Sequence, residues 1–119
     1  MAPSDFALFA ADLLAPLGPV ALKRMFGGTG FYLDGLMFAI VIDDTLYLCA
    51  DDELRAAFTE EGTGPFTYTA KGREVAVRRF HEVPGRLLDD GDELLDWARK
   101  ALRAAAIPAA KARAKPRKA

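Results

Sequence analysis

Residues 24–48, RMFGGTGFYLDGLMFAIVIDDTLYL, decide which fold the sequence predicts. Asp34-Gly35 is a strong hairpin signal between two apolar runs, because a type I′ turn needs positive φ at both of its central positions. The run that follows, residues 36–42, is apolar on both faces, which predicts a central strand that is covered on both sides. The stretch therefore predicts strands joined by tight turns, with the core of the protein built around them.

The glycines of this stretch, Gly27, Gly28 and Gly30, could suggest a phosphate-binding loop. Such a loop leads into a helix N-terminus, which supplies free N–H groups and a favourable dipole. Here a further strand pattern follows the glycines, at residues 31–33. We therefore expect a backbone bulge or close packing at the glycines rather than a ligand site.

Short strands and helices are predicted before and after the hairpin at Asp34-Gly35. Residues 22–26 are a short extended run, and Asp43-Asp44 turns the chain into a strand at residues 45–49. Ser4 is expected to cap a first helix, in which large apolar residues recur at helical spacing. Those residues are Phe6, Phe9, Leu13 and Leu17.

Two more helices and a strand pair complete the pattern. Residues 51–53 are acidic and begin a helix to about residue 60, and residues 89–93 begin a last helix that Pro108 ends. Between the helices, residues 66–80 read as two strands joined at Lys71-Gly72. The expected fold is α+β and two-layered, in the order α-β(3)-α-β(2)-α, with a mainly antiparallel sheet.

The charge is distributed unevenly along the 119 residues. Residues 1–107 are expected to form one domain, and residues 108–119 a basic, disordered tail. The tail has no acidic residue, and its five basic residues are candidates for salt-sensitive contact with nucleic acid or an acidic protein: Lys111, Arg113, Lys115, Arg117 and Lys118. The alternative is a solubilising terminus without a specific partner.

No set of residues in the sequence indicates catalysis, a metal site or a cofactor site. Cys49 is the only cysteine and His81 the only histidine, so one candidate enzyme would use this pair as nucleophile and base. A structural cysteine is the better interpretation, because the acidic residues 51–53 oppose a thiolate there. One His and one Cys cannot build a zinc cage, and most acidic residues lie in expected turns and helix starts.

The sequence gives no indication of a membrane protein or of a secreted one. The longest apolar run has seven residues, whereas a membrane-spanning helix needs about 20. The first residues do not have the charge pattern of a signal peptide, and a single cysteine excludes an internal disulfide. We therefore expect a cytoplasmic protein.

Several motifs, taken in order, resemble the N-terminal domain of the TfoX/Sxy family. The first lies in residues 24–39 and consists of Arg24, Met25, Phe26, Gly27, Gly28 and Gly30, followed by Asp34, Gly35 and Phe38. Later ones are Leu46-Tyr47-Leu48, Ala50-Asp51, Phe58, Gly64-Pro65-Phe66, Tyr68, Pro84, Leu88, Leu95 and Trp97-Ala98. The resemblance covers about residues 4–106, and the combined pattern is specific although each piece alone is weak.

The resemblance implies an α-β(3)-α-β(2)-α fold similar to secretion-chaperone-like domains. It also implies regulation, since the best-known members regulate bacterial competence genes together with the cyclic-AMP receptor protein. It implies no enzymatic activity, no cofactor and no catalytic residues, so the motif at residues 24–39 is treated as structural. Those regulators carry a second, helical domain of DNA-binding type, whereas this sequence continues into a basic tail, so a stand-alone N-terminal module is expected.

The sequence therefore predicts a non-enzymatic interaction module that acts as a transcriptional co-regulator through protein–protein contacts. The expected partners are proteins of the transcription machinery, and a homodimer is compatible because exposed strand edges invite pairing. Two alternatives stay open. One is a direct nucleic-acid binder that uses the basic tail, and the other is a small enzyme that uses Cys49 and His81.

Overall fold

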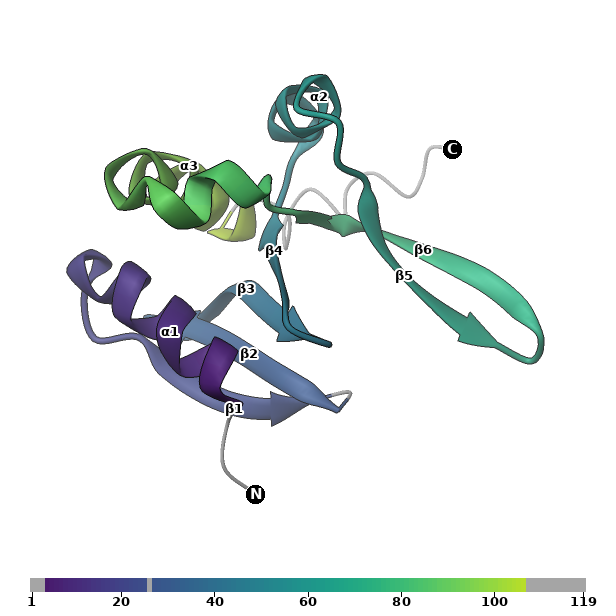
Figure 1. The fold of residues 1–119 in the computed structure, drawn as a ribbon, viewed down its shortest axis with the longest axis horizontal. Helices are drawn as coiled ribbons and strands as arrows, with labels where there is room; N and C mark the ends of the chain where they lie inside the picture. The colour runs from purple at the N-terminus through teal and green to yellow at the C-terminus, as the bar shows by residue number, and fades with distance from the viewer. Residues whose placement is uncertain (1–3, 26, 107–119) are drawn as a thin grey trace.

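A computed structural model describes residues 4–25 and 27–106, in which three α-helices accompany one antiparallel sheet (Figure 1). The elements are α1 (Asp5–Leu14), η1 (Ala15–Leu17), β1 (Ala21–Met25), β2 (Gly28–Leu33), β3 (Leu36–Ile42), β4 (Thr45–Cys49), α2 (Asp52–Glu60), β5 (Pro65–Ala70), β6 (Arg73–Glu82), η2 (Gly85–Asp89) and α3 (Gly91–Ala106). The predicted tail, residues 108–119, lies outside the described residues.

The six strands of the described chain lie in the order β1-β2-β3-β4-β6-β5, and every neighbouring pair is antiparallel. This confirms the predicted α+β class with an antiparallel sheet. The structure has one strand more before α2 than the predicted order, because β1 is a separate strand. Met25 pairs with Gly28, so the chain reverses tightly at Gly27, whose φ is +76°. Glycine adopts this conformation without steric cost.

The predicted turns are present and have the expected backbone conformation. Asp34 and Gly35 have φ of 53° and 82°, and Asp43 and Asp44 have φ of 51° and 56°. Asp tolerates positive φ better than most residues because its short side chain can bond to nearby backbone groups. These two turns fold β2, β3 and β4 into consecutive hairpins, as the stretch 24–48 predicts.

Gly28 confirms the expected close packing. A Cβ atom at this position would lie 2.2 Å from the backbone oxygen of Val41 and 2.7 Å from Cγ1 of Ile42. No side chain larger than hydrogen fits there unless β2 and β3 move apart. One bulge follows nearby, where the pairing of β2 with β3 shifts between Phe31 and Tyr32.

The core lies between the sheet and the helices. α3 packs on β3 and β4, and α1 packs beside α3. α1 begins at the expected cap, where Ser4 Oγ accepts from the Ala7 N–H at 3.1 Å. Asp51, which was expected in the first turn of α2, is instead its cap, since Asp51 Oδ1 accepts from the Leu54 N–H at 2.9 Å. Large side chains from all layers are fully buried, namely Leu14, Phe31, Phe38, Leu48, Phe58, Leu87 and Leu94.

The hairpin of β5 and β6 projects from this body as an arm (Figure 1). β6 joins β4 only through residues 80–82, whereas Phe66–Ala70 of β5 pair with residues 73–77 of β6. The pairing shifts between Pro65, which lies opposite His81, and Phe66, which lies opposite Val77. The intervening residues of β6 bend the hairpin away from the body. We call the paired residues 66–77 the arm.

Candidate interaction surfaces

Cys49 and His81, the two residues of the candidate enzyme, lie on opposite faces of the sheet. His81 pairs with Leu48, and Cys49 pairs with Phe80. Paired residues of antiparallel strands project to the same face and successive residues to opposite faces. The imidazole and the thiol are therefore separated by the sheet. They cannot exchange a proton as nucleophile and base.

The Cys49 thiol is also a poor nucleophile by its environment. Its side chain is fully buried, and this burial raises the pKa of the thiol above its ordinary value. Arg79 Nη2 lies 3.5 Å from Sγ, and its charge and hydrogen bond offset only part of the effect of burial. At neutral pH the thiol is protonated and hidden from solvent, as the structural interpretation of Cys49 requires.

His81 acts as an aromatic core residue. It is only 3% exposed, and its ring stacks on the ring of Phe58 at 5.4 Å between centroids. Phe58 packs in turn against Trp97 at 4.7 Å. Burial lowers the pKa of His81, and the positive charge of Arg55 lowers it further, so the ring is neutral at pH 7. Its Nδ1 atom has no hydrogen-bond partner among the described residues.

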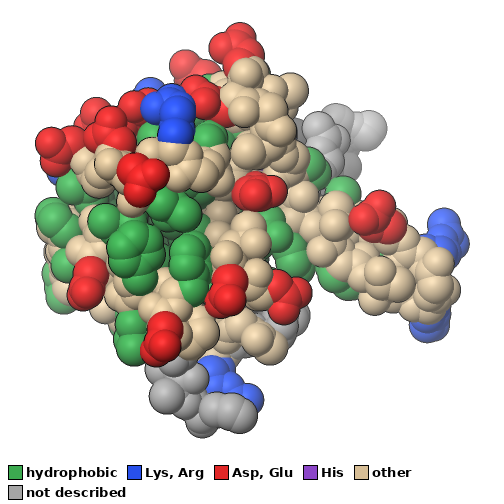
Figure 2. All heavy atoms as spheres, viewed as in Figure 1, with side chains coloured by type: hydrophobic (Ala, Val, Ile, Leu, Met, Phe, Trp, Pro, Cys, Tyr) green, Lys and Arg blue, Asp and Glu red, His purple; other side chains and the backbone are tan. Residues whose placement is uncertain are grey.

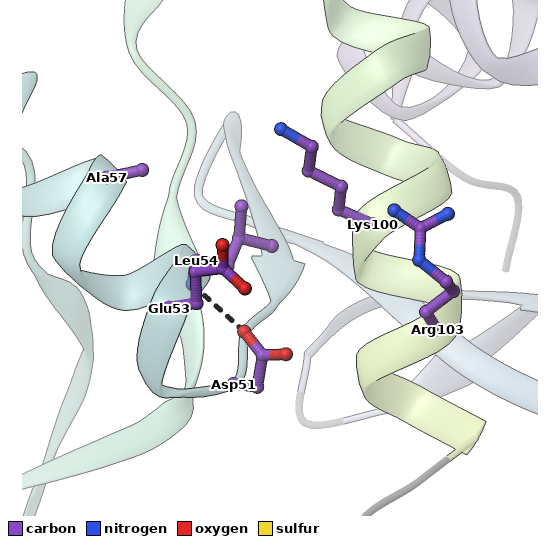
Figure 3. Close-up of a pocket in the computed structure, with 6 residues that line it drawn as sticks. All are labelled: Asp51, Glu53, Leu54, Ala57, Lys100 and Arg103. Carbon is purple, nitrogen blue, oxygen red and sulfur yellow. Dashed lines mark hydrogen bonds between the residues drawn. The ribbon is translucent and has the colours of Figure 1, made fainter.

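Two hollows flank α2. One, of about 250 Å³, lies between the start of α2 and the C-terminal half of α3, with Asp51 and Glu53 on one wall and Lys100 and Arg103 on the other (Figure 3). All four side chains are exposed, and Asp51 serves as the helix cap. Neither wall carries a thiol, an imidazole or a hydroxyl group. The hollow is therefore lined by two carboxylates that face two cationic side chains.

The second hollow, of about 370 Å³, lies between α2 and the residues of β5 and β6 at the base of the arm. Its lining consists of Asp52, Arg55, Ala56, Thr59, Pro65 and His81. Arg55 is held in place by Asp52 and by the backbone oxygen of Ala50, at 3.3 Å.

Among the described residues, no group of His, Cys, Asp and Glu side chains has a geometry that could hold a metal ion.

The solvent-facing side of α1 carries large apolar side chains. Leu8 and Phe9 are 48% and 45% exposed, and the ring of Phe6 lies 6.1 Å from that of Phe9. Together with the half-buried Leu13, these residues form what we call the α1 surface. Figure 2 shows hydrophobic side chains gathered where α1 lies, with acidic side chains around them. The α1 surface is therefore the first candidate interaction surface.

The arm is the second candidate surface. On one face of it the register places Phe66, Tyr68 and Ala70 beside Val75 and Val77. Tyr68 is 46% exposed, and Phe66 connects this face to the body through an edge-on contact with Tyr47 at 5.1 Å. Basic side chains lie at the tip of the arm and acidic side chains over the body (Figure 2). The arm therefore has both an apolar face and a charged tip.

The structure places the residues of the family motif in the hairpins and not around a cavity. Arg24 and Met25 lie on β1, Gly27 is in the turn, and Gly28 and Gly30 lie on β2. Asp34 and Gly35 form the next turn, and Phe38 is fully buried. Phe26 and the five basic residues of the tail lie outside the described residues.

The sequence pattern does not indicate either surface. Leu8 lies outside the apolar stripe that helical spacing predicts, and Phe9 is part of that stripe. The available signal was a second stripe of small residues beside it, Ala7 and Ala10, which the structure buries together with Leu14. For the arm, the signal was the alternation that places Tyr68 on the same face as Phe66.

Comparison with known proteins identifies the family. The model of the TfoX N-terminal domain matches residues 12–105, which is most of the chain. One similar protein is the "DNA transformation protein TfoX1" of Aliivibrio fischeri, which is 29% identical over 94 residues. That alignment covers 74% of this chain and 45% of the relative, so the chain spans less than half of the relative's length. The chain belongs to the TfoX N-terminal domain family.

Proposed function

We propose that this chain is a non-enzymatic regulatory module that acts on transcription by binding a protein partner through the α1 surface. Membership of the TfoX N-terminal domain family supports a regulatory role, and a relative is named as a DNA transformation protein. The separation of Cys49 from His81 argues against the enzyme alternative. The observation that carries the proposal is the exposure of Leu8 and Phe9 on the same side of one helix.

The spacing of the exposed residues on α1 indicates which features a complementary partner needs. Asp5, Leu8, Phe9 and Asp12 follow one another at i, i+3, i+4 and i+7, so they form one continuous exposed face. The two carboxylates lie about 10 Å apart along the helix axis, with the apolar side chains between them. A complementary partner has an apolar groove with a basic group near each end. This is the helix-in-groove form of recognition, in which the apolar anchors supply most of the affinity.

The α1 helix is well supported for this task. Its opposite side is anchored in the core by Ala7, Ala10 and Leu14, which are fully buried. Its start is fixed by the Ser4 cap. A helix that is ordered before binding loses little conformational entropy when the partner docks. The α1 surface can thus be altered without loss of the anchoring residues.

Site-specific photocross-linking tests the proposal. A benzoylphenylalanine residue replaces Phe9 in the full chain, which is expressed in its native cells, and the control carries the same residue in place of the exposed Ala56 on α2. We expect a subunit of RNA polymerase or a transcription factor to cross-link to position 9 and not to position 56. Equal cross-linking at both positions, or cross-links at position 9 to proteins outside transcription alone, would remove the proposed role of α1.

A second candidate function is direct binding of nucleic acid through the basic tail. The observation that favours it is the concentration of five basic residues and no acidic ones in residues 109–119. Contacts of this kind weaken steeply with salt, because binding releases the counterions of the phosphates. The measurement is retention of labelled DNA and RNA by the full chain and by a chain that lacks residues 109–119. Binding that is salt-dependent and lost with the deletion supports this function, and equal binding by both chains excludes it.

A further inference from the structure

The two edges of the sheet differ in how they are protected. β1, at one edge, carries the charged and exposed residues Lys23 and Arg24. Lys23 also lies over the ring of Tyr32, with Nζ 5.0 Å from the ring centre. β5, at the other edge, has no charged residue between Phe66 and Ala70. Proteins usually block a free edge with charge, and especially with lysine, so β5 is the edge that is open to a further strand.

The arm itself lacks a third strand. A hairpin of two strands is marginally stable in water, and a third strand with a shared apolar face is what stabilises it. The apolar face of the arm is only half covered, since Tyr68 is 46% exposed and Val75 and Val77 are partly exposed. The opposite face, with Thr67, Thr69, Glu74 and Ala76, is polar apart from Ala76 and exposed. A strand added beside β5 would extend both faces.

We propose that this strand is β5 of a second copy of the chain, paired antiparallel about a two-fold axis that passes through Thr67. If the two-fold axis passes through a residue, even-numbered residues of one strand lie opposite even-numbered residues of the other. The apolar faces of the two arms then lie on the same side of the paired strands. With the axis at Thr67, Phe66 of each copy lies opposite Tyr68 of the second copy, which forms two aromatic pairs on the apolar face. An axis at Tyr68 would instead set Phe66 against Ala70, and an axis between residues would set the apolar face against the polar one.

The charged residues at the tip and base of the arm support the same register. They also support a second copy of the chain as the source of the added strand. The tip of the arm carries Lys71 and Arg73, with Glu74 next to them. Glu60 ends α2 and Glu61 follows it, separated from β5 by three residues, and Glu61 is paired with Arg86 at 2.8 Å. With the axis at Thr67, Ala70 of one copy lies opposite Gly64 of the other. The tip of each arm, which has a net positive charge, therefore lies toward the acidic residues at the base of the other arm. A self-complementary surface of this kind is what a two-fold symmetric interface requires. The pairing does not involve α1, so it stands independently of the proposed function.

Oligomeric state tests the pairing, with a variant and a matched control. Light scattering after size-exclusion chromatography is expected to give a dimer for the full chain at micromolar concentration. Thr67→Lys places two like charges opposite each other at the axis and should raise the dissociation constant of the dimer about tenfold or more. Ala76→Lys is the control, because Ala76 lies directly opposite Thr67 on the same face but on the inner strand. This control should leave the dimer intact.

A disulfide tests the register. Thr67→Cys should form a covalent dimer under mild oxidation, since residues paired across antiparallel strands have Cα atoms about 5 Å apart, within disulfide range. Thr69→Cys is the control, because its two copies would lie about 13 Å apart along the strands. The native Cys49 is buried and does not compete. A monomer at all concentrations, a dimer that Thr67→Lys leaves intact, or equal cross-linking at positions 67 and 69 would each overturn the proposal.

Discussion

Replacing Gly28 with alanine tests the packing on which the sheet depends. The new Cβ atom would lie 2.2 Å from the backbone oxygen of Val41, which is about 1 Å inside normal contact. Because the obstacle is backbone, no rotamer change relieves it, and β2 must separate from β3 where Thr29 pairs with Val41. Overpacking of this kind costs about 1–3 kcal/mol, and rigid surroundings favour the upper end. Alanine also restricts the unfolded chain, which returns about 0.4–1 kcal/mol.

The net effect is a loss of about 2 kcal/mol in the free energy of unfolding, or roughly 8 °C in the melting temperature of a domain of this size. The measurement is thermal and urea unfolding followed by circular dichroism. Gly64→Ala is the matched control, because a Cβ atom there would meet no atom within 4 Å and the backbone needs no positive φ. It should be neutral or slightly stabilising. If both variants melt at the same temperature, the close approach of β2 and β3 at Gly28 does not limit stability.

Two further predictions concern the buried thiol and imidazole. Burial raises the pKa of Cys49, so a thiol reagent at pH 7.5 should label the folded chain at least about a hundredfold more slowly than the chain in urea; equal rates would contradict this burial. The lowered pKa of His81 in the folded state means that the unfolded chain binds a proton first, so stability should fall as pH drops below about 6.5. His81→Phe, which keeps a ring against Phe58, should abolish that part of the pH dependence, and an unchanged urea-midpoint profile would refute the assignment.

Local backbone chemistry made much of the fold predictable. The turns at Asp34-Gly35 and Asp43-Asp44 depend on residues that accept positive φ, so their sequence is sufficient to identify them. The cap at Ser4 is equally local. The predicted order lacks β1 as a separate strand, because the glycines that follow it indicate a bend and not the complete reversal that the chain makes at Gly27.

The surfaces could not be predicted in the same way, because they depend on non-local pairing. Helical spacing identifies two neighbouring stripes on α1 and does not say which of them faces α3; the structure buries the stripe of Ala7, Ala10 and Leu14 and leaves Phe9 exposed. The opposite faces of Cys49 and His81 follow from the register of β4 with β6, two strands that α2 and β5 separate in sequence. The projection of the arm likewise depends on the register shift between Pro65 and Phe66.

The described residues contain no helix that is long and apolar enough to cross a membrane. The predicted cytoplasmic location, the two-part division at residue 107 and the role of the basic tail stay predictions. The tail deletion described above tests the last of these.

The most direct measurement is the set of transcripts that this chain controls in its native cells. Cells that lack the gene are supplied with the wild-type chain, with Leu8→Ser combined with Phe9→Ser, or with Ala56→Ser as the surface control. Both altered side chains on α1 are about half exposed, so the double variant should fold, which circular dichroism checks. We predict that the double variant reproduces the transcripts of the deletion, while Ala56→Ser restores the wild-type set. Full restoration by the double variant would contradict regulation through the α1 surface.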